Sequence, residues 1–213
     1  HDMQAARGTP VDDDHGSDRS GGSLLADRRT WGVFAVAWLV LLVTDQVTKI
    51  LAVRHLTDRP DVELVGEVLQ LHLTYNPGAA FSIGTDYTWA FTVLAIVATF
   101  VVLWLSRRVA SRWWAVALAF LLAGITGNLI DRLVRDPEPF RGHVVDFLML
   151  PNWPVFNIAD VCINVGVAMV LVQILRGIDL GGRRLSDTGD DTGDDEMPGE
   201  AREDGQSSRE DAS

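Results

Sequence analysis

The sequence predicts an α-helical integral membrane protein with four transmembrane helices and a small extracytoplasmic β-sheet on an outer loop. Three observations predict this fold class. The central part of the chain holds four long apolar segments, arginines gather beside alternate ends of these segments, and one connecting segment alternates apolar and polar residues. A soluble bundle of buried helices is the alternative. It is disfavoured because the chain has too little polar surface to cover four such segments.

The apolar segments have the length that a membrane span requires. A helix rises about 1.5 Å per residue, so about 20 residues cross a hydrocarbon core about 30 Å thick. Residues 87–105 and 113–130 carry no charge, and residues 155–175 are apolar apart from four polar positions. The first segment covers residues 30–43 and resumes at 50–53. It therefore spans the membrane only if the polar turn between its two parts stays helical.

Arginines predict the orientation of the four spans. Bases with almost no compensating acids lie before the first segment, between the second and third, and after the fourth. Such residues favour the cytoplasmic side of a membrane. Both termini are therefore expected in the cytoplasm, and the loops at 54–86 and 131–154 are expected outside. The residues concerned are Arg28, Arg29, Arg107, Arg108, Arg112, Arg176, Arg183 and Arg184.

Charge and composition exclude several functions. The 213-residue chain has a formal net charge of −11, of which residues 186–213 alone carry −9. The charge therefore excludes nucleic-acid binding through a basic surface as the main function. The single cysteine, Cys162, permits no intrachain disulfide, and the five histidines have no metal-ligand spacing, so neither a metal nor another cofactor is expected. The polar ends predict a disordered cytoplasmic segment at 1–29 and an acidic disordered cytoplasmic tail at 177–213.

The first outer loop has the pattern of a β-strand. Leu69, Leu71, Leu73 and Tyr75 alternate with polar residues, which is the period of a strand with one apolar face. Residues 62–68 are a candidate partner strand, and Asn-Pro-Gly at 76–78 ends the pattern with turn residues. A small sheet on the outer membrane surface follows, with its apolar face toward lipid or substrate.

Polar residues collect near one end of the predicted helices. Ionisable groups at membrane depth are costly and usually face a bundle interior or a wet cavity. With the predicted topology, three helical faces and an aspartate in the apolar run 144–147 all fall near the outer membrane boundary. Their convergence predicts a functional site. The residues are Asp45, Thr48 and Lys49; Asn128, Asp131 and Arg132; Asn157, Asp160 and Asn164; and Asp146.

Structural roles compete with functional ones at several of these positions. Asp45 with Lys49, and Asp131 with Arg132 or Arg135, have the spacing of ion pairs that tie helices together. For Asn164 we expect a structural role, in which its side chain forms a hydrogen bond to a neighbouring helix.

Asp146 and Asp160 have no obvious basic partner, although Arg141 is near enough in sequence to reach Asp146. Two acids at one depth are best explained as a pair that shares a proton.

Five strings of residues resemble the lipoprotein signal peptidase family, signal peptidase II. They cover roughly residues 31–176 in the family's order, and together they are highly specific. The resemblance implies a four-helix bacterial plasma-membrane protein with an outer β-cradle and an active site near the outer leaflet. It also implies an aspartic endopeptidase that removes the signal peptide from diacylglyceryl-modified prolipoproteins, cutting just before the lipid-modified cysteine. The strings are DQVTK at 45–49, NPGAAF at 76–81, GNLIDR at 127–132, HVVDF at 143–147 and FNIAD at 156–160.

The resemblance also assigns roles to residues. The family's catalytic aspartates fall on Asp146 and Asp160. Residues 30–176 would form the peptidase domain, acting as a monomer on a lipid-modified prolipoprotein among membrane lipids. Residues 136–140 lengthen one loop and the acidic tail is extra, but neither departure touches a motif. Substrate-binding positions fall on Asn76, Asn128, Arg132 and Asn157, and supporting positions on Asp45, Lys49, Gly78 and Asp131.

Two rival functions remain open at this point. Intramembrane Asp and Arg also mark proton relays in proton-coupled transporters, although four helices without an evident inverted repeat fit that class poorly. A non-enzymatic membrane scaffold would use the same polar residues only to hold its helices together.

Overall fold

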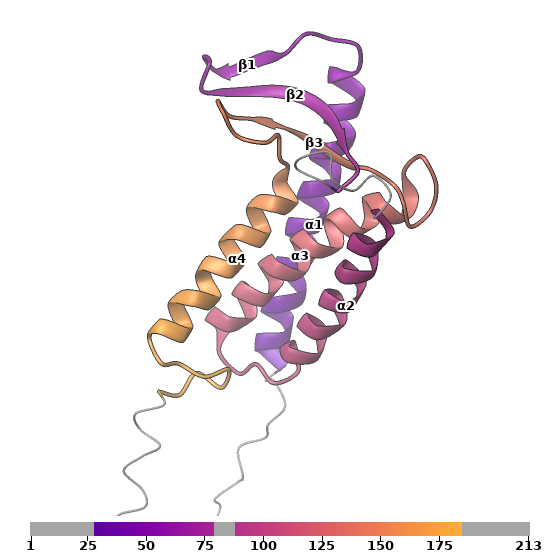
Figure 1. Cartoon of the computed structure of the whole chain (residues 1–213). Helices are drawn as coiled ribbons and strands as arrows, with labels where there is room; N and C mark the ends of the chain where they lie inside the picture. Colours follow the sequence, from indigo (N-terminus) through magenta and orange to yellow (C-terminus); the bar gives the residue numbers. More distant parts are fainter. Residues whose placement is uncertain (1–27, 79–87, 185–213) are drawn as a thin grey trace, which may run out of the picture.

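The computed structural model describes residues 28–78 and 88–184. It contains four helices, each long and apolar enough to cross a membrane, and a three-stranded sheet at one end of the bundle (Figure 1). The four predicted spans are confirmed. The helices are α1 (Arg28–Leu56), α2 (Thr88–Ser106), α3 (Arg112–Val134) and α4 (Ile158–Leu175).

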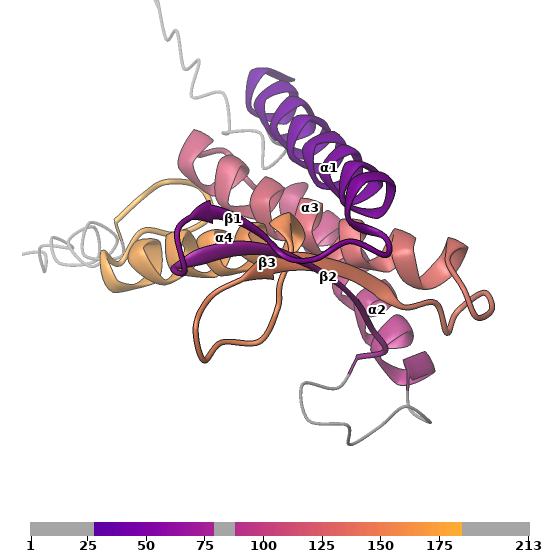
Figure 2. The ribbon, with the colours of Figure 1, turned by 90° about the horizontal axis from the view of Figure 1, so that it is seen from above.

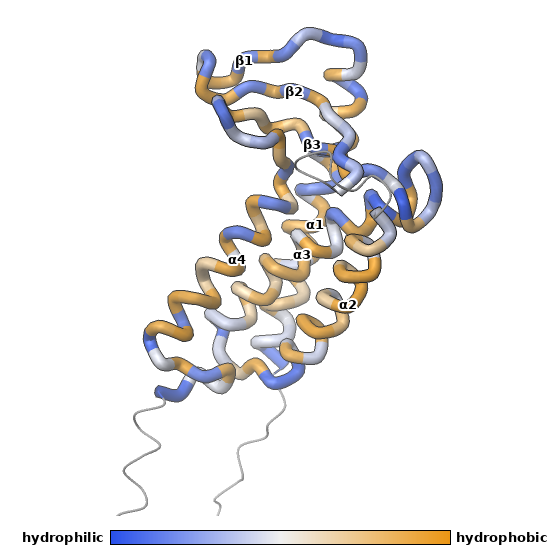
Figure 3. Tube along the Cα trace, in the orientation of Figure 1, coloured by the Kyte–Doolittle hydropathy of each residue, from blue (hydrophilic) through white to orange (hydrophobic). Residues whose placement is uncertain are grey.

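Helix α1 runs unbroken through its polar turn. Its 29 residues measure about 44 Å, so its C-terminal end extends beyond a hydrocarbon core of about 30 Å and reaches the sheet. Asp45 and Lys49 stay helical because both side chains point into the bundle, where they are almost completely buried. The helix exteriors are apolar, and hydrophilic residues gather at the two ends of the bundle (Figure 3).

Helix α3 lies at the centre of the bundle and contacts each of the other three helices. Small residues allow this close packing. A Cβ on Gly124 would lie 2.4 Å from the carbonyl oxygen of Ala159, and one on Gly166 would lie 2.9 Å from the backbone nitrogen of Leu121. The backbones of α3 and α4 therefore approach as closely as glycine permits.

The sheet is antiparallel and has the order β1-β2-β3. Its strands are β1 (Val62–Val65), β2 (Leu69–Asn76) and β3 (Val144–Met149), so the predicted hairpin is confirmed. β3 was not predicted as a strand. Its first four residues are all buried, and a strand covered on both faces does not alternate in sequence.

The apolar face of the sheet is covered by the protein itself. Leu71 and Leu73 pack against Ala52 and Leu56 at the C-terminal end of α1, together with Val145 of β3. The expectation that this face meets lipid or substrate is therefore wrong for Leu71 and Leu73. The opposite, polar face of the sheet is the one that leads to the buried aspartate of β3.

The first residue of α1 and the last residue of α4 lie at the end of the bundle opposite the sheet (Figure 1). Helix α1 already begins at Arg28, two residues before the predicted domain boundary at 30. Residues 177–184, which were assigned to the disordered tail, form a turn in which Ile178 bridges Arg184 and the Leu180 carbonyl accepts from the Ala110 N–H. The remaining predicted disorder, at 1–27 and 185–213, lies outside the described residues, as do residues 79–81 of the NPGAAF string.

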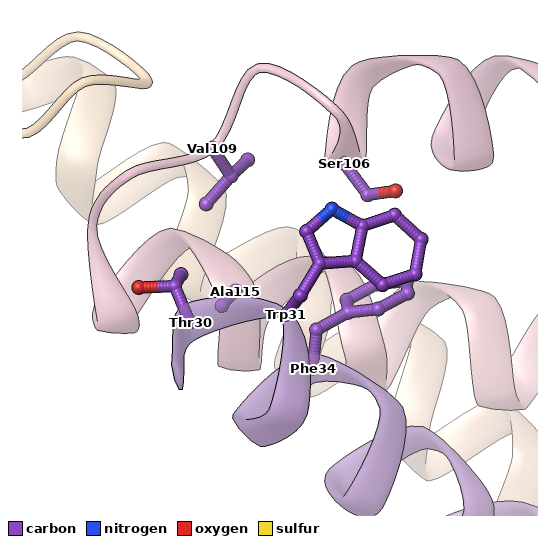
Figure 4. A pocket seen from close by; sticks show the side chains of 6 residues that line it. All are labelled: Thr30, Trp31, Phe34, Ser106, Val109 and Ala115. Atoms are coloured by element: carbon purple, nitrogen blue, oxygen red, sulfur yellow. The ribbon is translucent and has the colours of Figure 1, made fainter. Parts of the chain in front are cut away.

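Side chains from three segments close the bundle at this same end. Trp31 and Phe34 of α1 meet edge to face, with their ring centroids 5.5 Å apart, beside Val109 and Ala115 (Figure 4). The hollow between these side chains leaves no room for a water molecule. Its role is packing, which leaves the sheet end of the bundle as the place for chemistry.

Candidate active site

Asp146 and Asp160 lie where the sheet meets the bundle. Asp146 sits in the middle of β3 and is 1% exposed, while Asp160 occupies the first turn of α4. Neither forms an ion pair within residues 28–78 and 88–184. Their partners are amide groups from three elements, which hold the two carboxylates in place without neutralising them.

Asn157 connects the two aspartates. It is the N-cap of α4: its Oδ1 accepts from the Asp160 N–H at 3.0 Å, and Asp160 Oδ2 accepts from the Asn157 N–H at 3.1 Å. This capping box fixes the orientation of the Asn157 amide. The Nδ2 group therefore points at Asp146 and donates to its Oδ1 over 2.6 Å.

Asn76 holds Asp146 from the other side. Its Nδ2 donates to Asp146 Oδ2 at 2.9 Å, and its Oδ1 accepts from the Gly78 N–H at 2.8 Å, which again fixes the amide. Gly78 has φ +114°, a conformation that side chains rarely adopt, and a Cβ there would lie 2.7 Å from the ring of Phe91. The turn after β2 therefore requires glycine at this position.

Asn128 holds Asp160 in the same manner. Its Nδ2 donates to Asp160 Oδ1 at 2.9 Å, while its Oδ1 accepts from Lys49 Nζ at 2.9 Å and from Asn157 Nδ2 at 3.1 Å. Because ammonium groups only donate, Lys49 determines which end of the Asn128 amide faces the carboxylate. Three amides with fixed orientations thus direct N–H groups at the two aspartates.

Lys49 is a buried positive charge that contacts Asp45, Asp131 and Asn128. Its Nζ lies 3.1 Å from Asp45 Oδ2 and 2.8 Å from Asp131 Oδ2, and its side chain is completely buried. Asp45 also accepts from the Ala159 N–H at the start of α4, and Asp131 accepts from the Val145 N–H beside Asp146 and from Arg135. The expected ion pairs of Asp45 and Asp131 are therefore present, and they join α1, α3, α4 and β3.

Of the two bases expected as possible partners of Asp131, Arg135 forms the ion pair, and Arg132 lies elsewhere. Its guanidinium lies over the ring of Phe91, 5.7 Å from the centroid, and its buried Nη1 has no hydrogen-bond partner in the part of the chain that the structure describes. Guanidinium N–H groups are strong donors to oxygen. Arg132 therefore presents an unused donor beside the turn at Gly78.

Two minor expectations are wrong. Arg141 does not reach Asp146, because it forms an exposed ion pair with Glu138 at 3.1 Å. Asn164 does not link helices, because its amide donates to the Asp160 carbonyl one turn earlier in the same helix.

Gln46 is a site residue that the sequence analysis does not single out: its Nε2 donates both to Asp45 and to the Gly127 carbonyl. Its sequence signal was a polar residue beside Asp45 in an apolar segment.

The surroundings of Asp146 favour a carboxyl group that keeps its proton. Burial and, to a smaller extent, the charge of Asp160 raise the pKa of Asp146 to about 6, against the opposing effect of its hydrogen bonds from Asn76 and Asn157. A proton bound near neutral pH is what a carboxyl group needs in order to act as a general acid. The raised pKa of Asp146 therefore suits it to the role of a general acid.

A cavity of about 440 Å³ opens beside Asp160. Asn76 and Asp160 line its polar side, while Val161 and Val165 of α4 and Trp153 of the preceding loop line its apolar side. In residues 28–78 and 88–184, no group of three or more His, Cys, Asp or Glu side chains could hold a metal ion. The site can thus bring a peptide with apolar neighbours to two carboxyl groups.

Comparison with known proteins identifies the family. Residues 37–176 match the family model described as signal peptidase (SPase) II. The chain belongs to the signal peptidase II family. It is therefore a peptidase, embedded in the membrane by four helices.

Individual relatives agree with this membership. The chain is 42% identical over 167 residues to the lipoprotein signal peptidase of Mycobacterium leprae, an alignment that covers 78% of this chain and 83% of the relative. It is 46% identical over 140 residues to that of Mycolicibacterium smegmatis (66% and 60% covered) and 44% identical over 158 residues to that of Leifsonia xyli (74% and 73% covered).

Solved structures support the fold. A bacterial membrane enzyme determined in meso at 1.9 Å resolution superposes with a TM-score of 0.61 at 26% identity, covering 68% of this chain and 94% of that one. A second, at 2.3 Å resolution, gives a TM-score of 0.58 at 26% identity, covering 78% and 95%. The arrangement of four helices and a sheet in this signal peptidase II is thus shared with membrane enzymes.

Proposed function

We propose that this signal peptidase II is an aspartic endopeptidase that cleaves diacylglyceryl-modified prolipoproteins just before the lipid-modified cysteine, with Asp146 and Asp160 as its catalytic residues. The observation that carries the proposal is the convergence of three fixed amides on these two carboxyl groups. An arrangement that only tied helices together would pair each carboxylate with a base, as Asp45 and Asp131 are paired with Lys49.

Peptide hydrolysis by this pair needs one proton shared between two carboxyl groups. Asp160 begins ionised and takes a proton from a water molecule, whose oxygen attacks the scissile carbonyl carbon. Asp146 begins protonated and donates to the carbonyl oxygen, so the tetrahedral intermediate carries no net charge on that oxygen. As the C–N bond breaks, the nitrogen takes the proton that Asp160 acquired, one hydroxyl group of the intermediate returns its proton to Asp146, and a carboxylic acid and an amine leave. The titration belongs to the pair as a unit.

The neighbouring side chains position the reacting groups and the substrate. Asn76, Asn128 and Asn157 keep the carboxyl groups at fixed places, so little reorganisation is needed during the reaction. The unused Nη1 donor of Arg132 is available to a carbonyl oxygen of the bound peptide. We assign Asn76, Asn128, Asn157 and Arg132 to substrate binding and positioning, and Asp45, Lys49, Gly78 and Asp131 to the support of that arrangement.

The lipid on the substrate sets the depth of the cleaved bond. Val161 and Val165 line the cavity and are more than one-third exposed on the outside of α4. Diacylglyceryl chains held in the bilayer beside α4 would bring the scissile bond to the level of the aspartates near the outer leaflet, which lowers the entropic cost of encounter. We further propose that the protein acts as a monomer.

The test is direct cleavage. The full chain, purified in detergent, is incubated with a diacylglyceryl-modified prolipoprotein and with the same protein lacking the lipid. Release of the signal peptide from the lipidated form, with much slower release from the other, is the expected result. Absence of cleavage in a preparation that melts cooperatively would contradict the proposal.

A further inference from the structure

The polar face of the sheet forms a continuous surface that starts at the active site. Along β2, Thr74 and Asn76 lie near Asp146, and beyond a β-bulge between Leu71 and Thr74 the strand reaches Gln70. Thr74 pairs with Asp146 on β3, and Asn76 donates to the Asp146 carboxyl group. From Asn76 to Gln70 this face extends about 20 Å, at about 3.3 Å per residue.

A second cavity lies at the far end of this polar face. It has a volume of about 470 Å³ and is lined by Gln70 and Met149, which pair across the sheet, and by Glu63, which pairs with Gln70 from β1. Trp153 lines this cavity as well as the cavity beside Asp160, so the two are neighbours with one wall in common. The β1–β2 hairpin that carries the cavity extends on the α4 side of the bundle, away from α2 (Figure 2).

The second cavity is acidic. Glu63 and Glu67 both line it and are exposed, and neither forms an ion pair within residues 28–78 and 88–184. On the same face, Asp61 is already paired with His72, with 2.6 Å between the carboxylate oxygen and Nδ1. Beyond the two aspartates, a chain that lies along this face meets unpaired negative charge at Glu63 and Glu67.

We infer that the first residues of the mature lipoprotein, downstream of the cleaved bond, lie along the polar face of the sheet, and that Glu63 and Glu67 favour basic side chains about six residues from that bond. The inference rests on the proposed function. The segment upstream of the bond is apolar, as signal peptides are, and belongs in the membrane beside the helices. The downstream segment leaves the membrane toward the sheet, and the polar face is the surface that begins at the catalytic aspartates.

The test uses substrates that differ in charge at one place. Lipidated prolipoproteins carry two Lys, two Gln or two Glu at the fifth and sixth residues after the scissile bond, and kcat/KM is measured with the full chain at low salt. Exposed ion pairs are individually weak, so two of them should favour the Lys substrate over the Glu substrate by about fivefold. The preference should shrink as salt screens the charges and should fade as the Lys pair is moved to positions two and three or ten and eleven.

Variants of the enzyme locate the preference. The double variant Glu63→Gln, Glu67→Gln should bring the Lys-to-Glu ratio close to one, and Glu63→Lys, Glu67→Lys should reverse it. Glu138→Lys, which changes an exposed acid on the other outer loop, should leave the ratio unchanged. All variants should cleave the Gln substrate at the wild-type rate.

A ratio of one in the wild type, or a ratio that survives the charge reversal, would overturn the inference while leaving the proposed function intact. Failure to cleave any of the three substrates would instead overturn the proposed function.

Discussion

We propose that Asp45 supports the site without taking part in the reaction. Its Oδ2 lies 3.1 Å from Lys49 Nζ, and its Oδ1 accepts from the Ala159 N–H, just before Asp160. One carboxylate thus holds the lysine that orients Asn128 and also the start of the helix that carries Asp160. We expect its loss to affect the fold first and catalysis as a consequence.

Asp45→Asn should therefore lower thermal stability and activity together. The amide keeps one acceptor oxygen but loses the charge that offsets Lys49, and hydrogen bonds to charged groups contribute about 1.5–3 kcal/mol. Melting curves in detergent beside cleavage rates are the measurement, with the exposed Asp58→Asn as the control. A variant with normal melting and no activity would assign Asp45 to the chemistry instead.

Asp146 should make stability depend on pH. Burial raises the pKa of Asp146 from 3.8 to about 6, so the folded protein binds this proton more tightly than the unfolded chain does. The resulting stability is full below the unfolded pKa and is lost as the pH rises through about 6.

Asp146→Asn cannot ionise, so its melting temperature minus that of the wild type should increase from pH 4 to pH 7. A shift of about two units corresponds to about 3 kcal/mol at most. Melting curves of both proteins across this range provide the measurement, and a difference that does not change with pH would contradict the buried, protonated state of Asp146.

At the scale of elements, the contact between α3 and α4 depends on glycine. A Cβ on Gly124 would lie 2.4 Å from the Ala159 carbonyl oxygen and 2.6 Å from Ile163, whereas a Cβ on Gly32 of α1 would meet nothing within 4 Å. Because Ala159 precedes Asp160, this contact also sets the position of the Asp160 carboxyl group relative to Asn128.

Gly124→Ala should destabilise the protein by about 1–3 kcal/mol, the usual cost of forcing extra atoms into a packed core. Gly32→Ala should be neutral or slightly stabilising, because alanine is the better helix former. Thermal melting of both variants separates packing from helix propensity. Equal melting temperatures would show that α3 and α4 can move apart at no cost.

The elements differ in how well the sequence predicted them. The four helices followed from apolar length, and β2 followed from alternation, because each faces lipid or water on one side and protein on the other. β3 was missed since its residues from Val144 to Phe147 are all buried. A local sequence pattern also could not predict that Asn76, Asn128 and Asn157 converge. Their hydrogen bonds to the two aspartates join residues that are 11 to 70 positions apart in the chain.

At the scale of the whole molecule, the positions of the arginines predict how the protein is oriented in the membrane. The end opposite the sheet carries Arg28, Arg108 and Arg183, and the sheet end carries Asp58 and Glu138. We propose that the arginine end is cytoplasmic and that the aspartates lie near the outer leaflet.

Cysteine labelling in intact cells tests this orientation. Cys162 is first replaced by Ala. A cysteine at Asp58 or at Glu138 should then react with an impermeant thiol reagent, and one at Arg108 should not. All three positions are exposed, so differences in labelling report the side of the membrane. The reverse pattern would place the site on the wrong side for an exported substrate.

The central claim is that Asp146 and Asp160 perform the cleavage as a pair, and single-turnover cleavage by Asp146→Asn and Asp160→Asn tests it most directly. Each change should reduce the rate by at least about 10³, because an amide cannot exchange a proton near neutral pH. The double variant should be scarcely slower than either single one. Melting curves should show folded protein, and the exposed Glu138→Gln should cleave at the wild-type rate. Substantial cleavage by either folded variant would remove that aspartate from the mechanism and direct the search to Asp131.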